Sequence, residues 1–464
     1  MKETLSTFRN VPSVDELLRA EAASSIASVA GQDYALELAR RAQACLRQEL
    51  NGGNEIGSSK ESMLAKALDY MVELSDRESR GQLQNVINGT GVVIHTNLGR
   101  APMSHAAGRA VAEASAYCNL EFDLESGRRG RRAPTCEDLI AKLTGAENAL
   151  IVNNCAAAAF FVLTVLAEGG EVVISRGELV EIGGDFRVPD VLTQSGAILR
   201  EVGTTNRTRL GDYAAGLSNN SRLILRVHPS NYRITGFTSK PPLSELADLA
   251  HRNGLILYED IGSGSLVDLS HKGLLDEPVV SESIAAGVDI VTFSGDKLVG
   301  GPQAGIIAGR RELIERLRRH PLYRALRVGK LIYAGLEATL LAYRKGTINE
   351  VPVIAMISLD AEAIRKRTEA FILRFHEHYA GALTVEPMTS ASAVGGGAAP
   401  GVSLDTVVIA LRHPAINAEE IGHILRKADP PVITRIEKDR VLIDLRTVLP
   451  EEETILIDLL RSIV

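Results

Sequence analysis

The chain has 464 residues, more than one hydrophobic core usually supports, so we expect two or three domains. Its 45% hydrophobic and 23% charged residues are typical of a globular protein and exclude collagen-like, coiled-coil and wholly disordered chains. The formal net charge of −7 argues against nucleic-acid binding through overall charge, although a local basic face is compatible with that sum.

Cysteine spacing and apolar runs limit the classes further. The four cysteines form no CxxC pair, which argues against zinc ribbons and thioredoxin-like motifs, so we expect no metal site. The first twenty residues lack the apolar segment of a signal peptide, and no apolar stretch is long enough to span a bilayer. We therefore expect a cytoplasmic protein with reduced thiols and no membrane partner.

Residues 1–80 are predicted to form an N-terminal helical domain. Ser13 and Glu16 have the spacing of a capping box, and apolar residues recur at helical intervals after them. Residues 51–60 are predicted to be a linker, followed by a helix over about 61–80. This segment is slightly acidic overall, but three arginines cluster in it and can contribute to one basic helix face: Arg40, Arg41 and Arg47.

Residues 81–335 are predicted to form an α/β core domain. Short apolar β-rich runs alternate here with segments of helical length, which indicates a mostly parallel sheet covered on both faces. Ligands of such open sheets bind at the carboxyl ends of the strands, where several polar clusters occur in this sequence. The predicted strands cover about 149–154, 171–175, 222–228, 255–260, 289–295 and 304–309.

Residues 336–464 are predicted to form a small α+β domain. A helix is expected over 360–380, and a glycine-rich loop at 395–401 precedes a strand at 406–413. Two further strands are expected around 432–446, before a closing helix.

The first polar strand end in the core is a candidate anion site. A predicted strand ends at Asn153 and Asn154, and a helix begins within the following Cys155-Ala156 alanine-rich run. A helix N-terminus offers free backbone N–H groups and a positive dipole end to an anion such as a cofactor phosphate. Many strand-to-helix turns share this pattern, so it does not identify a ligand by itself.

The second candidate is Asp260, which ends a predicted strand before a turn rich in glycine and serine. A carboxylate in this place can keep the pyridine nitrogen of pyridoxal 5′-phosphate (PLP) protonated, so that the ring accepts electrons. The alternative is an aspartate that caps the next helix. Side-chain alternation directs the neighbouring Glu259 to the other face of the sheet.

The third candidate is Lys297, which follows a predicted strand and precedes a glycine-rich turn. A lysine amine becomes nucleophilic when its surroundings lower its pKa, and it can then bond to a cofactor aldehyde. The alternative is a surface lysine in a β-hairpin. The order of anion turn, aspartate and lysine along one sheet is that of fold-type-I PLP enzymes, which strengthens the three weaker signals.

Six segments of the chain closely resemble the bacterial L-seryl-tRNA(Sec) selenium transferase family, also called selenocysteine synthases. The resemblance is dense over about 85–335 and looser in the flanking regions. Shorter relatives in the same superfamily lack the N-terminal segment and act on small amino compounds. The matching segments are INGTGVVIHTNLGRAPMS (87–104), SRGELVEIGGDFRVPDV (175–191), EVGTTNRT (201–208), VHPSNYRITGFT (227–238), DIGSGSLVDL (260–269) and SGDKLVGGPQAG (294–305).

The resemblance implies roles for individual residues. Lys297 would be the Schiff-base lysine, and Asp296 an active-site acid beside it. Arg100, Arg324 and Arg327 would bind selenophosphate, because a guanidinium fork suits an oxyanion. A solvated helix face remains the alternative for Arg324 and Arg327.

Two further segments each allow more than one interpretation. The loop 125–134 carries four arginines that either contact phosphates at the mouth of the site or form a mobile charged loop. His228 or Asn231, which follow another predicted strand, are candidates for a place near the cofactor.

The implied fold is a fold-type-I PLP-dependent transferase. The implied reaction converts L-seryl-tRNA(Sec) to L-selenocysteinyl-tRNA(Sec) with selenophosphate, through a PLP-bound aminoacrylyl-tRNA. The implied assembly is a homo-oligomeric ring, a decamer. The alternatives are a PLP-dependent lyase acting on a small amino acid or amino sugar phosphate, and a non-catalytic tRNA-binding relative. The N-terminal segment argues against the lyase, and the candidate site residues argue against the non-catalytic protein.

Overall fold

The structure is a computed structural model that describes residues 10–51, 59–81, 83–183 and 186–463. Its contacts divide the chain into two compact units, Met1–Val86 and Ile87–Val464. Each unit is described below by itself.

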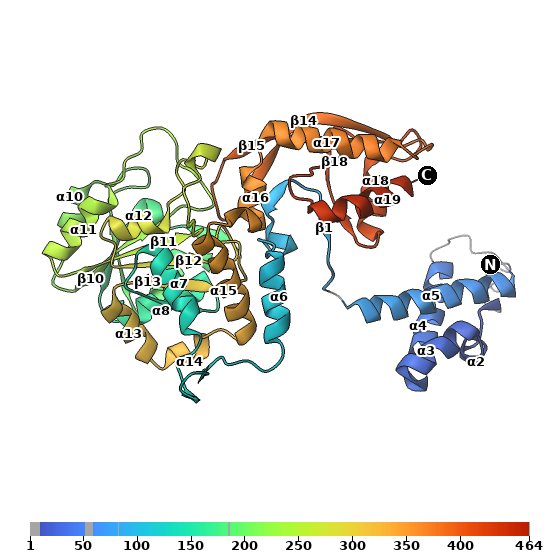
Figure 1. Ribbon diagram of the computed structural model, residues 1–464, viewed down its shortest axis with the longest axis horizontal. Helices are drawn as coiled ribbons and strands as arrows, with labels where there is room; N and C mark the ends of the chain where they lie inside the picture. The colour runs from blue at the N-terminus through green and yellow to red at the C-terminus, as the bar shows by residue number, and fades with distance from the viewer. Residues whose placement is uncertain (1–9, 52–58, 82, 184–185, 464) are drawn as a thin grey trace. The chain divides into compact units, whose positions relative to one another are not determined.

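The first unit is helical, and the helices of its described residues pack around one small core (Figure 1). The predicted capping box is present, because the Ser13 side chain accepts from the Glu16 backbone and the Glu16 carboxylate accepts from the Ser13 backbone. Most of the predicted linker at 51–60 lies outside the described residues. The helices are α2 (Val14–Leu18), α3 (Glu21–Ala30), α4 (Gln32–Asn51) and α5 (Lys60–Arg80).

The second unit is built on a seven-stranded sheet. Within it β13 is antiparallel to both of its neighbours, and the other strand pairs are parallel, which confirms the predicted mostly parallel α/β core. The connection from β12 to β13 spans only 295–304, too short for the crossover that a parallel pair needs. In spatial order the strands are β5 (Asn148–Val152), β13 (Gly305–Gly309), β12 (Ile290–Ser294), β11 (Ile256–Gly262), β10 (Ser221–Val227), β6 (Glu171–Ser175) and β9 (Ile198–Val202).

Helices cover both faces of this sheet, as the continuous apolar strands predict. Alternate residues of one strand enter two different cores: Ile151 packs in one hydrophobic cluster, and Val152 packs in the other. One layer contains α8 (Cys155–Ala167), α9 (Val188–Gln194) and α13 (Arg311–Arg319). The other contains α7 (Pro134–Thr144), α11 (Leu243–Arg252), α12 (Val280–Ala285) and α15 (Lys330–Lys345).

A second, five-stranded sheet carries the C-terminal helices. Its longest strand, β14, was not expected from the sequence, whose prediction placed no strand before 406 in this region. The helices α17 (Ala361–His376), α18 (Ala418–Lys427) and α19 (Glu453–Arg461) share an apolar core with it. In spatial order the strands are β17 (Arg435–Glu437), β18 (Arg440–Ile443), β15 (Ser403–Arg412), β14 (Thr384–Gly395) and β2 (Val92–Ile94).

Residues 87–94, which the prediction assigned to the core domain, contribute strands to this C-terminal region instead. β2 pairs with β14, and β1 (Ile87–Asn88) pairs with β16 (Val432–Ile433). Strands of two or three residues are too short to show a period of two, so the sequence alone carried no signal for this pairing.

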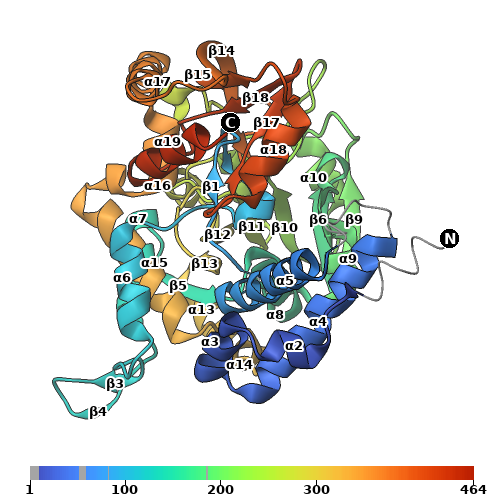
Figure 2. The same ribbon diagram turned by 90° about the vertical axis from the view of Figure 1, so that its right-hand side faces the viewer.

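The second unit also carries a short hairpin after α6 (His105–Ala114). Its strands are β3 (Phe122–Asp123) and β4 (Arg128–Arg129), and Figure 2 shows it projecting beyond the end of α6.

None of the described helices is both long and apolar enough to cross a membrane.

Candidate functional site

The carboxyl ends of β5, β10, β11 and β12 lie along one edge of the seven-stranded sheet, because these strands run in the same direction. Asn154, His228, Asp260 and Lys297 all lie at or just beyond these ends. Residues that are up to 143 positions apart in the chain are therefore gathered at the edge where open α/β sheets bind ligands.

Lys297 is buried just beyond β12. Two glycines make room for its amine. A Cβ atom on Gly397, in the glycine-rich loop that follows β14, would collide with Nζ, and one on Gly262 of β11 would lie 4.0 Å from it. Both glycines have positive φ, so the backbone disfavours a side chain at each, and at Gly397 the lack of space excludes one as well. The surface-hairpin alternative for Lys297 is therefore wrong.

Asp260 is buried at the end of β11, and neutral groups are its hydrogen-bond donors. Its Oδ1 accepts from Thr292 Oγ1 at 2.8 Å and from Cys155 Sγ at 3.4 Å. Burial raises the pKa of Asp260, while Thr292 and Cys155 oppose that shift. Burial also raises the pKa of the Cys155 thiol, which therefore stays a protonated donor. The carboxylate is thus hydrogen-bonded but has no ion-pair partner among the described residues.

This arrangement fits PLP. A protonated pyridine nitrogen is a cationic donor, which is what the Asp260 environment lacks, and Lys297 lies close enough to act on the Asp260 pKa. The helix-capping alternative for Asp260 is not observed, since the residue lies within β11.

The N-terminus of α8 is open as an anion site. Asn154 caps the helix by accepting from the Ala157 backbone N–H at 2.8 Å. The backbone N–H of Asn153 donates to the Leu326 carbonyl at 3.0 Å. The first-turn N–H groups of Cys155 and Ala156 have no acceptor within the helix and are suited to a phosphate.

Asp296 and Arg100, predicted separately, form one ion pair. Arg100 Nη1 lies 2.7 Å from Asp296 Oδ2, and the Ala101 backbone N–H donates to the Asp296 carbonyl at 3.2 Å. Arg100 has a φ of +65°, a conformation that non-glycine residues rarely adopt. The loop therefore holds the guanidinium beside the residue that precedes Lys297.

The other two predicted anion ligands form no direct hydrogen bond or ion pair with Arg100 or Asp296 among the described residues. Arg324 is exposed on α14 (Leu322–Leu326), and Arg327, just beyond the helix, lies 4.0 Å from the Glu121 carboxylate. No hydrogen bond or ion pair among the described residues joins either arginine to Arg100. Their role in anion binding stays a prediction.

The arginine-rich loop is mostly paired within the chain. Arg129 and Arg132 each donate to Glu121 at 2.7 Å, and Arg131 donates to the buried Glu137 at 2.7 Å. Arg131 and Arg132, which also donates to the Val328 carbonyl at 2.9 Å, tie the end of the loop to the core, whereas the pair of Arg129 with Glu121 lies within the hairpin itself. Both interpretations of the loop therefore stay open.

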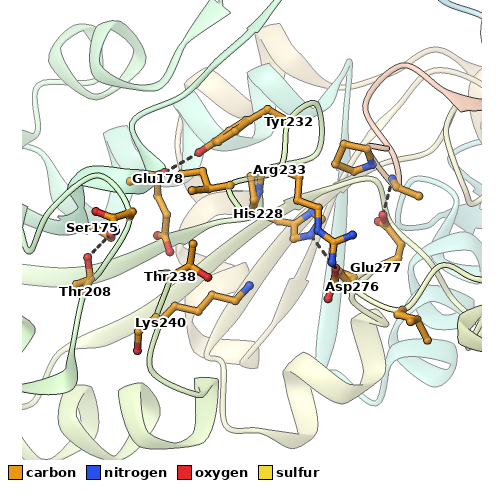
Figure 3. Close-up of a pocket in the computed structure, with 18 of the residues that line it drawn as sticks. Ser175, Glu178, Thr208, His228, Tyr232, Arg233, Thr238, Lys240, Asp276 and Glu277 are labelled. Atoms are coloured by element: carbon orange, nitrogen blue, oxygen red, sulfur yellow. Dashed lines mark hydrogen bonds and ion pairs between the residues drawn. The ribbon is translucent and has the colours of Figure 1, made fainter. Parts of the chain in front are cut away.

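A cavity of about 480 Å³ opens at the same edge of the sheet (Figure 3). His228 lines it, and its backbone N–H donates to the Asp260 carbonyl at 2.9 Å. Burial, followed by the charge of Lys240, lowers the His228 pKa to about 4, so the imidazole is neutral near pH 7. Asn231 is exposed and donates to the Glu181 carbonyl at 2.8 Å. Of the two, His228 is the one beside Asp260.

The sequence analysis missed two charged groups on the walls of this cavity. Glu178 is buried in a 2.9 Å ion pair with Arg226 of β10 and also accepts from the Val227 backbone at 3.1 Å. Glu277 is half-buried at the opposite wall (Figure 3). An arginine inside an otherwise apolar strand was the available signal for the first; nothing in the local pattern around Glu277 marks it.

Comparisons with known proteins match nearly the whole chain to one family. The family model described as L-seryl-tRNA selenium transferase matches residues 86–449, and that described as Selenocysteine synthase N terminal matches residues 8–47. The L-seryl-tRNA(Sec) selenium transferase of Geobacter sulfurreducens is 43% identical over 464 residues, covering 99% of this chain and 100% of the relative. That of Desulfovibrio desulfuricans is 49% identical over 389 residues, 82% of each chain.

Among solved structures, D-glucosaminate-6-phosphate ammonia-lyase superposes with a TM-score of 0.56 at 20% identity, covering 82% of this chain and 95% of that one. This likeness concerns the fold alone, and it agrees with the predicted fold-type-I architecture. The sequence relatives and the family model together show that the chain belongs to the L-seryl-tRNA selenium transferase family.

Proposed function

We propose that this protein converts L-seryl-tRNA(Sec) to L-selenocysteinyl-tRNA(Sec), with PLP as cofactor and selenophosphate as selenium donor. The observation that carries the proposal is the convergence of Lys297, Asp260 and the α8 N-terminus at one sheet edge. That arrangement occurs in a chain 43% identical to a selenium transferase over 99% of its length.

Three groups of the chain would hold the cofactor. Lys297 would bond to its aldehyde carbon, and Asp260 would pair with its ring nitrogen. Its phosphate would meet the first turn of α8, where Asn153, Asn154, Cys155 and Ala156 are the predicted ligands. Bound PLP draws electrons from the Cα atom of an attached amino acid, which makes the Cα proton removable. The freed Lys297 amine would be the base that takes this proton.

The selenium donor is proposed to bind beside Lys297. Asp296 orients Arg100 through their 2.7 Å ion pair, which leaves the other guanidinium N–H groups for an oxyanion. Arg324 and Arg327 are proposed as further anion ligands. An arginine cluster suits selenophosphate because several charge-assisted hydrogen bonds can form to its oxygens.

The first unit is proposed to bind the tRNA body. Arg40 and Arg47 are exposed on α4, whereas Arg41 is paired with Glu37 and Glu78. The basic face we propose therefore rests on Arg40 and Arg47 rather than on all three arginines. We further propose that the protein acts in the cytoplasm as a homodecamer, with functional domains at 1–80, 81–335 and 336–464.

The test of the proposed function is conversion of seryl-tRNA(Sec) by the purified full chain supplied with PLP and selenophosphate. Formation of selenocysteinyl-tRNA is the expected result. No selenium transfer, with full PLP loading and intact tRNA, would contradict the proposal.

A second experiment separates tRNA from a small substrate. A chain lacking residues 1–80 should fold and bind PLP, because the cofactor residues all lie beyond 86, but it should bind seryl-tRNA weakly. Gel-shift titration at two salt concentrations measures this, since phosphate contacts make tRNA affinity depend on salt. Unchanged tRNA affinity would remove the tRNA role from the first unit and favour a small-substrate lyase.

A further inference from the structure

Glu277 is a half-buried residue whose carboxyl oxygen Oε1 is buried and forms no hydrogen bond among the described residues. It lies in the segment between η4 (Ser270–Lys272) and α12, and it lines the cavity at the sheet edge. Its Oε2 accepts from the Ala399 backbone N–H at 2.7 Å. Figure 3 marks this bond with a dashed line at Glu277. Its Oε1 is buried and has no hydrogen-bond partner among the described residues. An unpaired buried oxygen is costly, so Oε1 is available to the neighbouring Ser263 hydroxyl, which is also unpaired, or to a group that arrives with a ligand.

The same short loop touches both Glu277 and Lys297. Ala399 donates to Glu277, and Gly397, two residues earlier, lies directly against the Lys297 amine. Lys297 is near enough that its charge acts on the Glu277 carboxyl group. The loop of Gly397 and Ala399 therefore brings Glu277 close to the place where a substrate would be attached, although Lys297 itself does not line the cavity.

The protonation state of Glu277 suits a proton donor. Burial is the largest influence and raises the Glu277 pKa, while Ser263, the Ala399 amide and Lys297 lower it by smaller amounts. The Ser263 hydroxyl is close but outside hydrogen-bond geometry. A carboxyl group with a raised pKa keeps its proton closer to neutral pH, as a general acid requires.

The proposed reaction needs such an acid. Loss of the seryl Cβ hydroxyl as hydroxide is unfavourable, and a positioned acid turns the leaving group into water. We propose that Glu277 is the general acid that protonates the seryl hydroxyl as it leaves Cβ, an inference that rests on the proposed function. The Cα–H bond breaks with its proton passing to the Lys297 amine, and its electron pair forms the Cα–Cβ double bond. The Cβ–O bond breaks with its electron pair staying on oxygen, which takes the Glu277 proton and departs as water.

Other groups at this edge are less suited to donate a proton, although His228 Nδ1 and Ser230 Oγ are also buried without a hydrogen-bond partner among the described residues. Asp296 is paired with Arg100, and Asp260 accepts from Thr292 and Cys155. The His228 imidazole is neutral, and its Nε2 lies 3.2 Å from the Asp276 carbonyl. Glu259, which also keeps a buried oxygen unpaired, faces the layer of α12, because its neighbour Asp260 faces the layer of α8.

Glu277→Gln tests the proposal, because the amide oxygen can still accept from Ala399 while the transferable proton is lost. In D2O the variant should still exchange the Cα proton of seryl-tRNA, but water loss should slow by about 10²- to 10⁴-fold. With β-chloroalanyl-tRNA, whose chloride leaves without a proton, its elimination rate should return to within a few-fold of the unsubstituted chain. Asp276→Asn, which changes the exposed neighbouring carboxylate, is the matched control and should retain normal water loss.

Cofactor loading by absorbance and the melting temperature are measured on every variant. Glu277→Asp keeps the acid one carbon shorter and should lose water faster than Glu277→Gln. Normal water loss in Glu277→Gln would overturn the acid role. Equal loss of Cα exchange and of chloride elimination would overturn it too, and would make Glu277 a positioning residue for Lys297. Failure of the unsubstituted chain itself to dehydrate seryl-tRNA would instead contradict the proposed function.

Discussion

Two buried carboxylates near the same sheet edge are partnered in opposite ways. Glu178 meets a full cationic partner, Arg226, at 2.9 Å inside the protein. Asp260 meets a hydroxyl and a thiol, which donate hydrogen bonds but carry no charge. The first region is electrostatically complete and therefore structural, whereas the second lacks the cation that a bound ligand would supply.

Strand geometry keeps these two regions separate. Glu259 and Asp260 are adjacent in β11, yet Glu259 faces the layer in which Arg226 acts on its pKa, and Asp260 faces Cys155 of α8. Alternation along the strand places consecutive residues on opposite faces. One strand therefore supplies a carboxylate to the structural region and another to the binding region.

Removing the lysine should have the largest effect on the binding region. Lys297→Ala should abolish covalent PLP attachment and turnover, because no amine remains at the end of β12. Borohydride reduction followed by mass spectrometry of the labelled peptide measures attachment, and circular dichroism checks the fold. A variant that still formed a reducible adduct would place the anchor on another lysine.

Breaking the ion pair of Glu178 with Arg226 should instead lower the stability of the fold. Glu178→Ala should lower the free energy of unfolding by about 3–5 kcal/mol, because Arg226 would remain buried without its partner. Urea unfolding of the cofactor-free chain measures this loss. The matched control is Glu181→Ala, which removes an exposed pair with Arg187 and should cost less than about 1 kcal/mol. A loss for Glu178→Ala no larger than this control would show that the pair is not structural.

At Asp260 the comparison of the two regions predicts a loss of turnover with little loss of stability. Asp260→Asn should reduce turnover by roughly one to two decades, since a charge-assisted contact to the cofactor contributes about 1.5–3 kcal/mol. The unfolding free energy of the cofactor-free chain should change far less than in Glu178→Ala, because no buried cation loses its partner. Steady-state rates and urea unfolding of the same preparation test both halves. A stability loss as large as that of Glu178→Ala would remove the distinction between the two regions.

The smallest expected effect is on the pH dependence of stability. Burial raises the Asp260 pKa in the folded, cofactor-free chain above its unfolded value. The folded state then binds a proton more readily, so Asp260 favours folding more as pH falls through its folded pKa, and this contribution is lost as pH rises. Asp260→Asn lacks this contribution. On acidification, its unfolding free energy should therefore change in a direction less favourable to folding than that of the unsubstituted chain.

Comparing the two chains isolates Asp260, because Glu178 and Glu259, whose pKa values burial also raises, titrate in both. Equal pH profiles for the two cofactor-free proteins would contradict the shifted pKa of Asp260.

The sequence predicted most of what is local. The strand that carries Asp260, the strand that ends before Lys297, the turn at Asn154 and the Ser13 capping box follow from patterns within a few residues. It did not predict β14, whose alternation is irregular, or the pairing of β2 with it across 300 residues. The sequence also did not predict the ion pair of Arg100 with Asp296, because the two residues lie 196 positions apart.

Residue type and local periodicity therefore determined the fold class and the chemistry available at each strand end. The tertiary structure alone decided which of these groups meet. It assigned Asp296 to Arg100, surrounded Asp260 with neutral donors, and brought one loop, that of Gly397 and Ala399, into contact with both Lys297 and Glu277. The physical reason is that burial and partner charge set the state of a carboxyl group, and both depend on elements distant in the chain.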